Sequence, residues 1–230
     1  MFTSGGPSPH LLSIAGRYAS GFIAEVWTID EARAQRQLVR DAAREAGRDP
    51  DEVKYFAGLM TTVAPTVREG LDRRLALAGD VIEARLGHLG AMIGVELHPG
   101  RIDRPLSERE LAVARPSPND PRSGIALEVA RQGWSPRDVL AHGVIDFHPT
   151  TVGPGTVHAD HIQEWIEAGA VDGFWISPDV YEDGVDAFVD EVVPLLQERG
   201  LYPSSYPGAT LRENLGVPAQ YGLDPRITGE

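Results

Sequence analysis

The stretch from Thr151 to Ile176 constrains the fold more than any other part of the chain. Its apolar side chains recur at i, i+3 and i+4, the spacing of one helical face: Ile162, Trp165 and Ile166. Gly169 follows, where a glycine commonly ends a helix. Asp172–Ile176 is then a short apolar run, typical of a parallel strand covered on both faces. The stretch predicts a loop, an amphipathic helix and a buried strand, which is one step of an α/β fold.

The composition excludes several classes of protein. With 230 residues, the chain is long enough for one large domain with a full core. The net charge is −13, and Lys and Arg are scattered without a basic stripe, so nucleic acids and anionic membranes are poor partners. The absence of cysteine excludes disulfides and thiol catalysis. Because no apolar run reaches ~18 residues and no signal peptide is visible, we expect a soluble cytoplasmic protein.

Three earlier parts of the chain repeat the strand-then-helix order. We expect strands at Met1–Thr3, Gly21–Ala24 and Val53–Thr62, and helices at His10–Ala19, Thr28–Ala46 and Thr66–Leu86. The second helix begins with a capping box, because Thr28 is followed three residues later by Glu31. Each strand leading into a helix is the unit from which parallel sheets are built.

The remaining segments depart from this order. Between Gly87 and Pro149 the periodicity weakens and prolines accumulate, with short helices expected at Gly124–Arg131 and Pro136–His142. A last helix is expected at Gly184–Arg199, bent near Pro194, with one face formed by Val185, Phe188, Val189, Val192, Val193 and Leu196. The tail, Leu201–Glu230, is predicted to be loop with one helical turn at Thr210–Glu213.

These segments give about four β/α units, whereas a closed (β/α)8 barrel needs eight and about 250 residues. The sequence therefore predicts an α/β fold, a partial (β/α)8 TIM barrel with a long insertion before the last crossover helix. We predict a single domain over 1–230. It divides into a half-barrel frame (1–86 and 150–200), an insertion (87–149) and a C-terminal tail (201–230).

Several motifs resemble one family over nearly the whole chain. They are Gly21–Ala24 with Thr28–Ala34, Ala43–Pro50, Val152–Gly153, Gln163–Phe174, Phe188–Leu201 and Thr210–Gly216. In order and in much of their spacing, they resemble the C-terminal half of the flavin-dependent, bacterial-luciferase-like monooxygenases. Within that family the chain is most similar to the nitrilotriacetate, alkanesulfonate and long-chain alkane monooxygenases.

The resemblance implies a two-component monooxygenase. Such enzymes bind reduced FMN at the carboxyl ends of the barrel strands and oxidise a small organic substrate with O2. A separate NADH:flavin reductase supplies the FMNH2. Family members also carry a preceding half-chain with strands one to four. The alternative is a non-catalytic fragment or subunit that self-associates or pairs with an N-terminal half-barrel chain. A deazaflavin-dependent oxidoreductase of the same superfamily matches the C-terminal motifs less well.

The turn Ser4–Ser8 is the candidate cofactor site. Backbone N–H groups in a glycine-rich turn at the start of a helix can hold a phosphate. The resemblance implies that this turn holds the phosphate of FMN, with Gly5, Gly6 and Ser8 as the binding residues. Pro7 departs from the family pattern and removes one N–H donor. The alternative is that Ser8 is simply a helix cap.

Other candidates follow predicted strands or lie in the central insertion. In a barrel, chemistry occurs where strands end, which singles out Glu25, Val26, Trp27, Met60, Thr61, Ser177 and Asp179. Each can equally be loop packing. His148 is the catalytic candidate, because the family often has a histidine in a Gly-His-Arg segment there. Its neighbours here are Phe147 and Pro149, so a structural or partner-facing role is favoured.

Three residues at the start of the helix in the opening stretch are of types that bind metal ions. His158 and His161 share a helical face at i, i+3, and Asp160 lies between them. No third ligand is evident in the sequence, so we expect no metal and interpret these residues as a solvated helix start.

Overall fold

A computed structural model describes residues 1–218 of the chain, which form two compact units. The first unit comprises Met1–Gly58, Asp160–Ile176 and, among the described residues, 196–218. The second comprises Leu59–Ala159 and Ser177–Leu195. The division into frame, insertion and tail within one domain stays a prediction, and residues 219–230 of the predicted tail lie outside the described residues.

Five strands form one sheet. They are β1 (Phe2–Ser4), β2 (Gly21–Ala24), β3 (Lys54–Val63), β4 (Thr150–Gly153) and β5 (Gly173–Pro178). The order is β1-β2-β3-β4, and β5 also pairs with β3. The first three pairings are parallel. β5 runs the same way, because the N–H of Asp172 donates to Tyr55 O and that of Asp179 donates to Thr61 O. The predicted α/β fold with a parallel sheet is confirmed.

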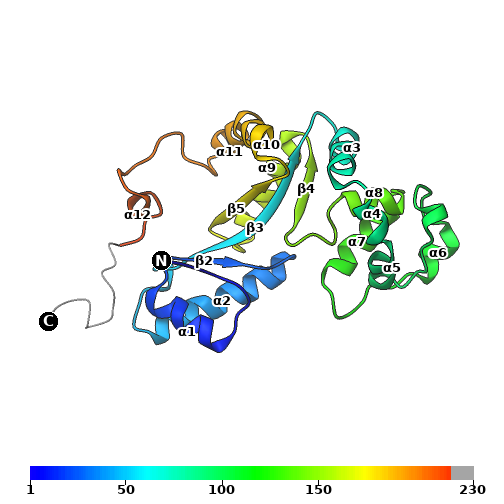
Figure 1. The fold of residues 1–230 in the computed structure, drawn as a ribbon. Helices are drawn as coiled ribbons and strands as arrows, with labels where there is room; N and C mark the ends of the chain where they lie inside the picture. The colour runs from blue at the N-terminus through cyan, green and yellow to red at the C-terminus, as the bar shows by residue number, and fades with distance from the viewer. Residues whose placement is uncertain (219–230) are drawn as a thin grey trace. The chain divides into compact units, whose positions relative to one another are not determined.

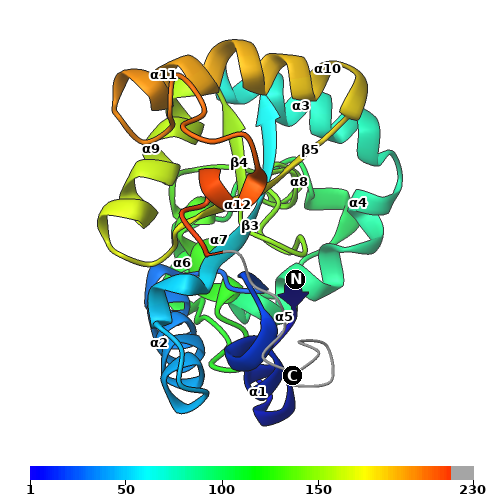
Figure 2. The same ribbon diagram turned by 90° about the vertical axis from the view of Figure 1, so that its left-hand side faces the viewer.

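In the first unit, α1 (Pro9–Tyr18) and α2 (Ile29–Glu45) lie side by side against β2 (Figures 1 and 2). The predicted capping box is confirmed, since Thr28 Oγ1 accepts from the N–H of Glu31 and the Glu31 carboxylate accepts from that of Thr28. The helices cover an apolar core that includes Phe22, Ala24, Val39, Tyr55 and Trp165. The buried Tyr55 hydroxyl donates to Gln35 Oε1 at 2.8 Å, which satisfies the polar end of this side chain.

The second unit holds a separate helical core. Its helices are α3 (Val67–Ala78), α4 (Val81–Ala84), α5 (Leu86–Ile93), α6 (Glu108–Val113), α7 (Arg122–Arg131) and α8 (Pro136–Ala141). Helices α4 to α8 gather around Leu89, Ile93, Leu127, Val139 and Leu140 (Figure 1). The prediction of one helix over Thr66–Leu86 is wrong, because α3 ends at Gly79, whose φ of 52° lies outside the helical region. The helices predicted at 124–131 and 136–142 correspond to α7 and α8.

Helix α9 (Gly155–Glu167) and β5 form the predicted crossover. Gly169 ends the helix with φ 66°, as expected. Two details differ from the prediction. The expected loop at Thr151 is strand β4, and β5 is covered on one face only. Phe174 packs on Trp165 with ring centroids 5.8 Å apart, whereas Trp175 is 48% exposed on the opposite face.

The last long helix is irregular just before Pro194. It comprises α10 (Tyr181–Ala187), a π-turn (Phe188–Val192) and α11 (Val193–Glu198). Proline has no N–H for the carbonyl four residues earlier, and the N–H of Val193 reaches back five residues to Phe188 O. Its predicted apolar face is only partly buried, since Val185 and Val189 are exposed. The turn expected at Thr210–Glu213 is confirmed as α12 (Leu211–Asn214) with a capping box.

Candidate functional site

The Ser4–Ser8 turn leads from β1 into α1. Gly5 has φ 123°, a conformation that favours glycine, and its N–H donates to Ile23 O in β2 at 3.1 Å. The N–H of Ser8 donates to Gly6 O at 2.8 Å. Ser8 also caps α1, because its Oγ accepts from the N–H of Leu11 at 3.3 Å. The structure therefore places Gly5, Gly6 and Ser8 in one exposed turn at the carboxyl end of β1.

This turn can offer few donors to an anion. The N–H of Gly5 is committed to β2, and Pro7 and Pro9 have none. Within residues 1–218, the N–H groups of Gly6 and His10 donate to no other group. The hydroxyl hydrogen of Ser8 adds a third donor, since only the oxygen is used by the cap. The turn fits a phosphate group with these three donors, fewer than a turn without Pro7 would provide.

The end of β2 lies in the same unit as the turn. Val26 is 2% exposed and belongs to the apolar core. The Trp27 N–H donates to Glu31 Oε2 at 3.0 Å, so the backbone of Trp27 is part of the start of α2. Glu25 is half-buried. Among these three candidates, only Glu25 and Trp27 keep a side chain outside the core.

In the second unit, β3 brings together candidates that are distant in sequence. The N–H of Met60 donates to Pro149 O at 2.8 Å, and the N–H of Asp179 donates to Thr61 O at 3.0 Å. We call Met60, Thr61, His148 and Asp179 the strand-end cluster. Ser177 lies on β5, two residues before Asp179. Three separate stretches of sequence thus meet at the carboxyl-terminal half of β3. Asp179 follows the carboxyl end of β5, the end at which barrel enzymes carry their chemistry, whereas His148 precedes the amino end of β4.

The members of the strand-end cluster are largely buried. His148 is 4% exposed, and Thr61 is 1% exposed. Within the described part of the chain, the Thr61 Oγ1 atom has no hydrogen-bond partner. A buried hydroxyl without a partner is uncommon and costs free energy, so it marks a place to look for a ligand.

The carboxylate of Asp179 is already committed. Arg73 Nε donates to Asp179 Oδ2 at 2.6 Å, and Arg73 Nη2 donates to Asp183 Oδ1 at 2.7 Å. Arg73 is on α3 and Asp183 on α10, and Figure 2 shows these helices alongside each other. The hydrogen bond from Arg73 lowers the pKa of Asp183. Asp179 therefore acts as a structural anchor for the segment after β5, not as a free base.

His158 is buried, so the prediction of a solvated helix start is wrong for this residue. Its Nδ1 lies 2.6 Å from Thr151 Oγ1, and its Nε2 lies 3.0 Å from Gly153 O. Because a carbonyl oxygen only accepts, Nε2 carries the proton and Nδ1 accepts from the threonine hydroxyl. Burial lowers the pKa of the ring, which keeps it neutral. His158 thus ties the first turn of α9 to β4.

The other members of the proposed metal group point elsewhere. Asp160 pairs with Arg199 at 2.7 Å, and the ring of His161 lies 5.4 Å from that of Trp165. Throughout residues 1–218, no group of three His, Asp or Glu side chains is arranged to hold a metal ion.

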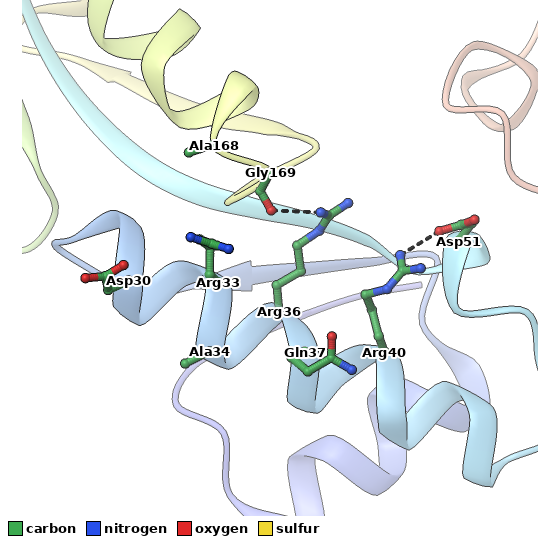
Figure 3. Close-up of a pocket in the computed structure, with 9 residues that line it drawn as sticks. All are labelled: Asp30, Arg33, Ala34, Arg36, Gln37, Arg40, Asp51, Ala168 and Gly169. Atoms are coloured by element: carbon green, nitrogen blue, oxygen red, sulfur yellow. Dashed lines mark hydrogen bonds and ion pairs between the residues drawn. The ribbon is translucent and has the colours of Figure 1, made fainter.

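A basic cleft of about 760 Å³ lies in the first unit (Figure 3). Sequence reasoning missed it, because the predicted helix places Arg33, Arg36 and Arg40 on one face but the cleft is completed by residues distant in sequence: Asp51, Ala168 and Gly169. Arg36 Nη1 donates to Gly169 O at 2.9 Å, and Arg40 Nη1 donates to Asp51 Oδ1 at 2.5 Å. The cleft lies at the amino ends of β3 and β5, the end that supports stability in barrels.

A match to a known family covers most of the chain. The protein-family model described as "Luciferase-like monooxygenase" matches residues 2–172 of the chain. The dibenzothiophene-sulfone monooxygenase of Rhodococcus erythropolis is 30% identical over 92% of this chain and 48% of its own. Component A of the nitrilotriacetate monooxygenase of Aminobacter aminovorans is 28% identical over 89% of this chain and 45% of its own.

Solved structures agree with the sequence matches. The EDTA monooxygenase EmoA of Chelativorans sp. BNC1 superposes with a TM-score of 0.71 and 26% identity, covering 94% of this chain and 50% of that one. The riboflavin lyase RcaE, solved with modified FMN and riboflavin, has a TM-score of 0.62 and 27% identity, with 94% and 47% covered. The chain spans about half the length of the curated relatives it matches. In residues 1–218, no helix is long and apolar enough to cross a membrane.

Proposed function

Because the chain belongs to the luciferase-like monooxygenase family, we propose that it acts in an FMN-dependent monooxygenase that oxidises a small organic substrate with O2. The observation that carries this proposal is the family match over residues 2–172. In the proposal, a separate NADH:flavin reductase delivers reduced FMN. The nitrilotriacetate enzyme supports a two-component system, since the matching relative is named component A.

The Ser4–Ser8 turn is the proposed site of the FMN phosphate. The N–H of Gly6 and the hydroxyl of Ser8 would donate to it, while the positive φ of Gly5 shapes the turn. The RcaE structure supports a flavin in this family, because it was solved with a modified FMN. Bound flavin would supply the oxygen chemistry. The protein would then have to bind and orient the flavin and the substrate, and to exclude water from them. His148 is the proposed protein group for proton handling, since it is buried beside Pro149 in the strand-end cluster.

The first test is titration of the purified chain with FMN, followed by flavin fluorescence quenching. We expect micromolar binding for the wild type. Ser8→Asp places a carboxylate beside the phosphate, and we expect at least about tenfold weaker binding, equivalent to ~1.4 kcal/mol. Ser8→Asn is the matched control, because both residues cap a helix about equally well and only Asp adds charge.

Two results would count against the proposed phosphate site. No binding at millimolar FMN would favour the non-catalytic alternative. Equal FMN binding by the Asp and Asn variants would show that the phosphate does not bind at this turn, even if flavin binds elsewhere on the chain.

A specific observation favours a second proposal, that the chain associates with itself or with an N-terminal half-barrel chain. Among the described residues, β1 pairs with β2 alone and β5 with β3 alone, so each leaves one strand edge unpaired. Phe2 on β1 is 44% exposed and Trp175 on β5 is 48% exposed. Unpaired edges and exposed aromatic side chains favour association.

Sedimentation velocity tests this second proposal. We expect the isolated chain to form oligomers at micromolar concentration, and Trp175→Lys to shift the distribution toward smaller species. Tyr181→Lys is the control, since Tyr181 is 73% exposed but lies on α10 and not on the sheet. A well-behaved wild-type monomer across the concentration range would contradict self-association and leave pairing with a half-barrel chain as the form to test by mixing.

A further inference from the structure

A buried carboxylate in the second unit is held between two arginines. The Asp146 side chain is 9% exposed, and Arg74 Nη2 donates to its Oδ2. Arg85 Nη1 donates to the other oxygen, Oδ1, at 3.2 Å. A carboxylate this buried is costly unless charged partners and hydrogen bonds compensate for its lost hydration. Both arginines come from the helical segments that follow β3, whereas Asp146 belongs to the segment that leads into β4.

Arg74 also fixes the surroundings of this carboxylate. It is itself only 14% exposed. Its Nε donates to Ala141 O at 2.6 Å, and its Nη1 donates to Thr62 Oγ1 at 3.4 Å. One guanidinium therefore joins the end of α8, the end of β3 and the Asp146 carboxylate. From α7, Arg122 Nη1 adds a hydrogen bond to Ile145 O at 3.3 Å.

The turn that carries Asp146 closes tightly. Gly143 has φ 76°, which favours glycine. A Cβ at this position would lie 2.5 Å from Thr150 Oγ1 and 2.7 Å from Asp146 Oδ2. The Thr150 hydroxyl lies 3.3 Å from His148 O and 3.4 Å from Asp146 Oδ2. Asp146 and Thr150 thus lie two residues before and two residues after His148, and each is held by these contacts.

We propose that Arg74 and Asp146 are positioning residues that hold His148 in the strand-end cluster. The segment between α8 and β4 lies outside the helices and strands, and turn hydrogen bonds such as that from the Asp146 N–H to Gly143 O at 2.9 Å hold it locally. The charged network adds its connection to Arg74 on α3 and, through Arg74, to Thr62 on β3. Pro149 is held on β3 by the Met60 N–H, and Asp146 fixes the side of the segment before His148. This inference rests on the proposed function only in assigning His148 to the functional site.

Arginine at position 74 is required by geometry as well as by charge. Its planar guanidinium reaches three acceptors at once, whereas a lysine ammonium is a point charge on a flexible stem. Arg74→Lys therefore keeps the carboxylate neutralised but removes the fork that joins α8, β3 and the turn. This substitution therefore tests the geometry of the guanidinium separately from its positive charge. Because the charge is retained, we expect the variant to fold.

The experiment follows the His148 imidazole by NMR without any flavin. The Cε1–Hε1 cross-peak of His148 is assigned by its loss in His148→Gln. In Arg74→Lys, we expect this cross-peak to shift and broaden, and amide hydrogen exchange over residues 144–150 to become about tenfold faster or more. Exchange in α1 is expected to stay unchanged. Asp146→Asn is the second variant, and it is expected to show the same local changes.

Arg137→Lys is the matched control. Arg137 is also in the second unit, and its Nε donates to Asp103 Oδ1 at 2.5 Å. An unchanged His148 signal in Arg74→Lys, or equal changes in Arg74→Lys and Arg137→Lys, would overturn the positioning role. A purely structural role would lower stability and speed exchange throughout the second unit. Because these measurements need no FMN, their failure is distinct from failure of the FMN titration.

Discussion

Gly16→Ala is expected to lower the free energy of unfolding by about 2–3 kcal/mol, even though alanine is the better helix former. Gly16 lies on α1 where this helix meets α2. A Cβ at this position would lie 2.3 Å from the carbonyl oxygen of Ala42 and 2.5 Å from its carbonyl carbon. These are backbone atoms, which cannot rotate away as a flexible side chain can. Relief requires the two helices to separate, which opens the core beneath them.

Urea unfolding followed by circular dichroism measures this effect. Gly124→Ala is the matched control, because Gly124 is inside α7 and a Cβ there meets nothing within 4 Å. It should gain up to about 1 kcal/mol from helix propensity alone. If both variants change stability in the same direction, the close approach of α1 to α2 is not what sets the choice of glycine.

The second large effect expected is a loss of stability in mild acid that depends on His142. The ring of His142 lies edge-on to Trp134 with centroids 5.1 Å apart, and burial lowers its pKa to about 4. Nearby Asp138 opposes this shift, while Arg74 and Arg68 reinforce it. An unfolded histidine has a pKa of about 6.5, so the unfolded chain binds an extra proton between these values.

The sign of the effect follows from this difference. The stability from neutral His142 is fully present above about pH 6.5 and is lost as the pH falls toward 4. The total is on the order of 3 kcal/mol, at 1.36 kcal/mol for each pKa unit. Urea unfolding at pH 7 and pH 4.5 measures it, with His142→Gln expected to remove this contribution to the difference and to leave the contribution of buried His158, whose pKa is also lowered. His98→Gln is the control, because the His98 side chain is 64% exposed. A His142 pKa near 6.5 by NMR would contradict the prediction.

Local signals in the sequence predicted most of the frame. The Thr28 capping box and the Gly169 stop act within one helical turn, so their residues alone determine the result. The β4 strand was missed because Thr150–Gly153 has only four residues and no clear alternation, and its pairing with Met60–Val63 supplies the strand. The break at Gly79 was missed because an isolated glycine inside a helical pattern is only weakly diagnostic.

The positions of candidate residues were predictable only where the order of strands and turns determines them. The strand predictions place Ser8 and Asp179 correctly just after a strand, while the roles of these residues stay predictions. Arg74 and Asp146 are 72 positions apart, and nothing local to either indicates the other. His158 looked solvated because it begins a helix, and its burial depends on Thr151 becoming part of β4. The Arg74–Asp146 contact and the burial of His158 therefore depend on residues distant in sequence or on strand pairing, which local sequence patterns do not predict.

The π-turn at Phe188–Val192 has a consequence for how this part of the chain can vary. A π-turn takes one more residue than the α-helical turn it replaces, so the helix before it and the helix after it are out of phase by about 100°. Val192 is fully buried at the end of this turn, whereas Val189 within it is 50% exposed. Loss of one residue from the turn would give a regular helix with its apolar residues facing solvent. The length of this segment is therefore as constrained as the identity of its core residues.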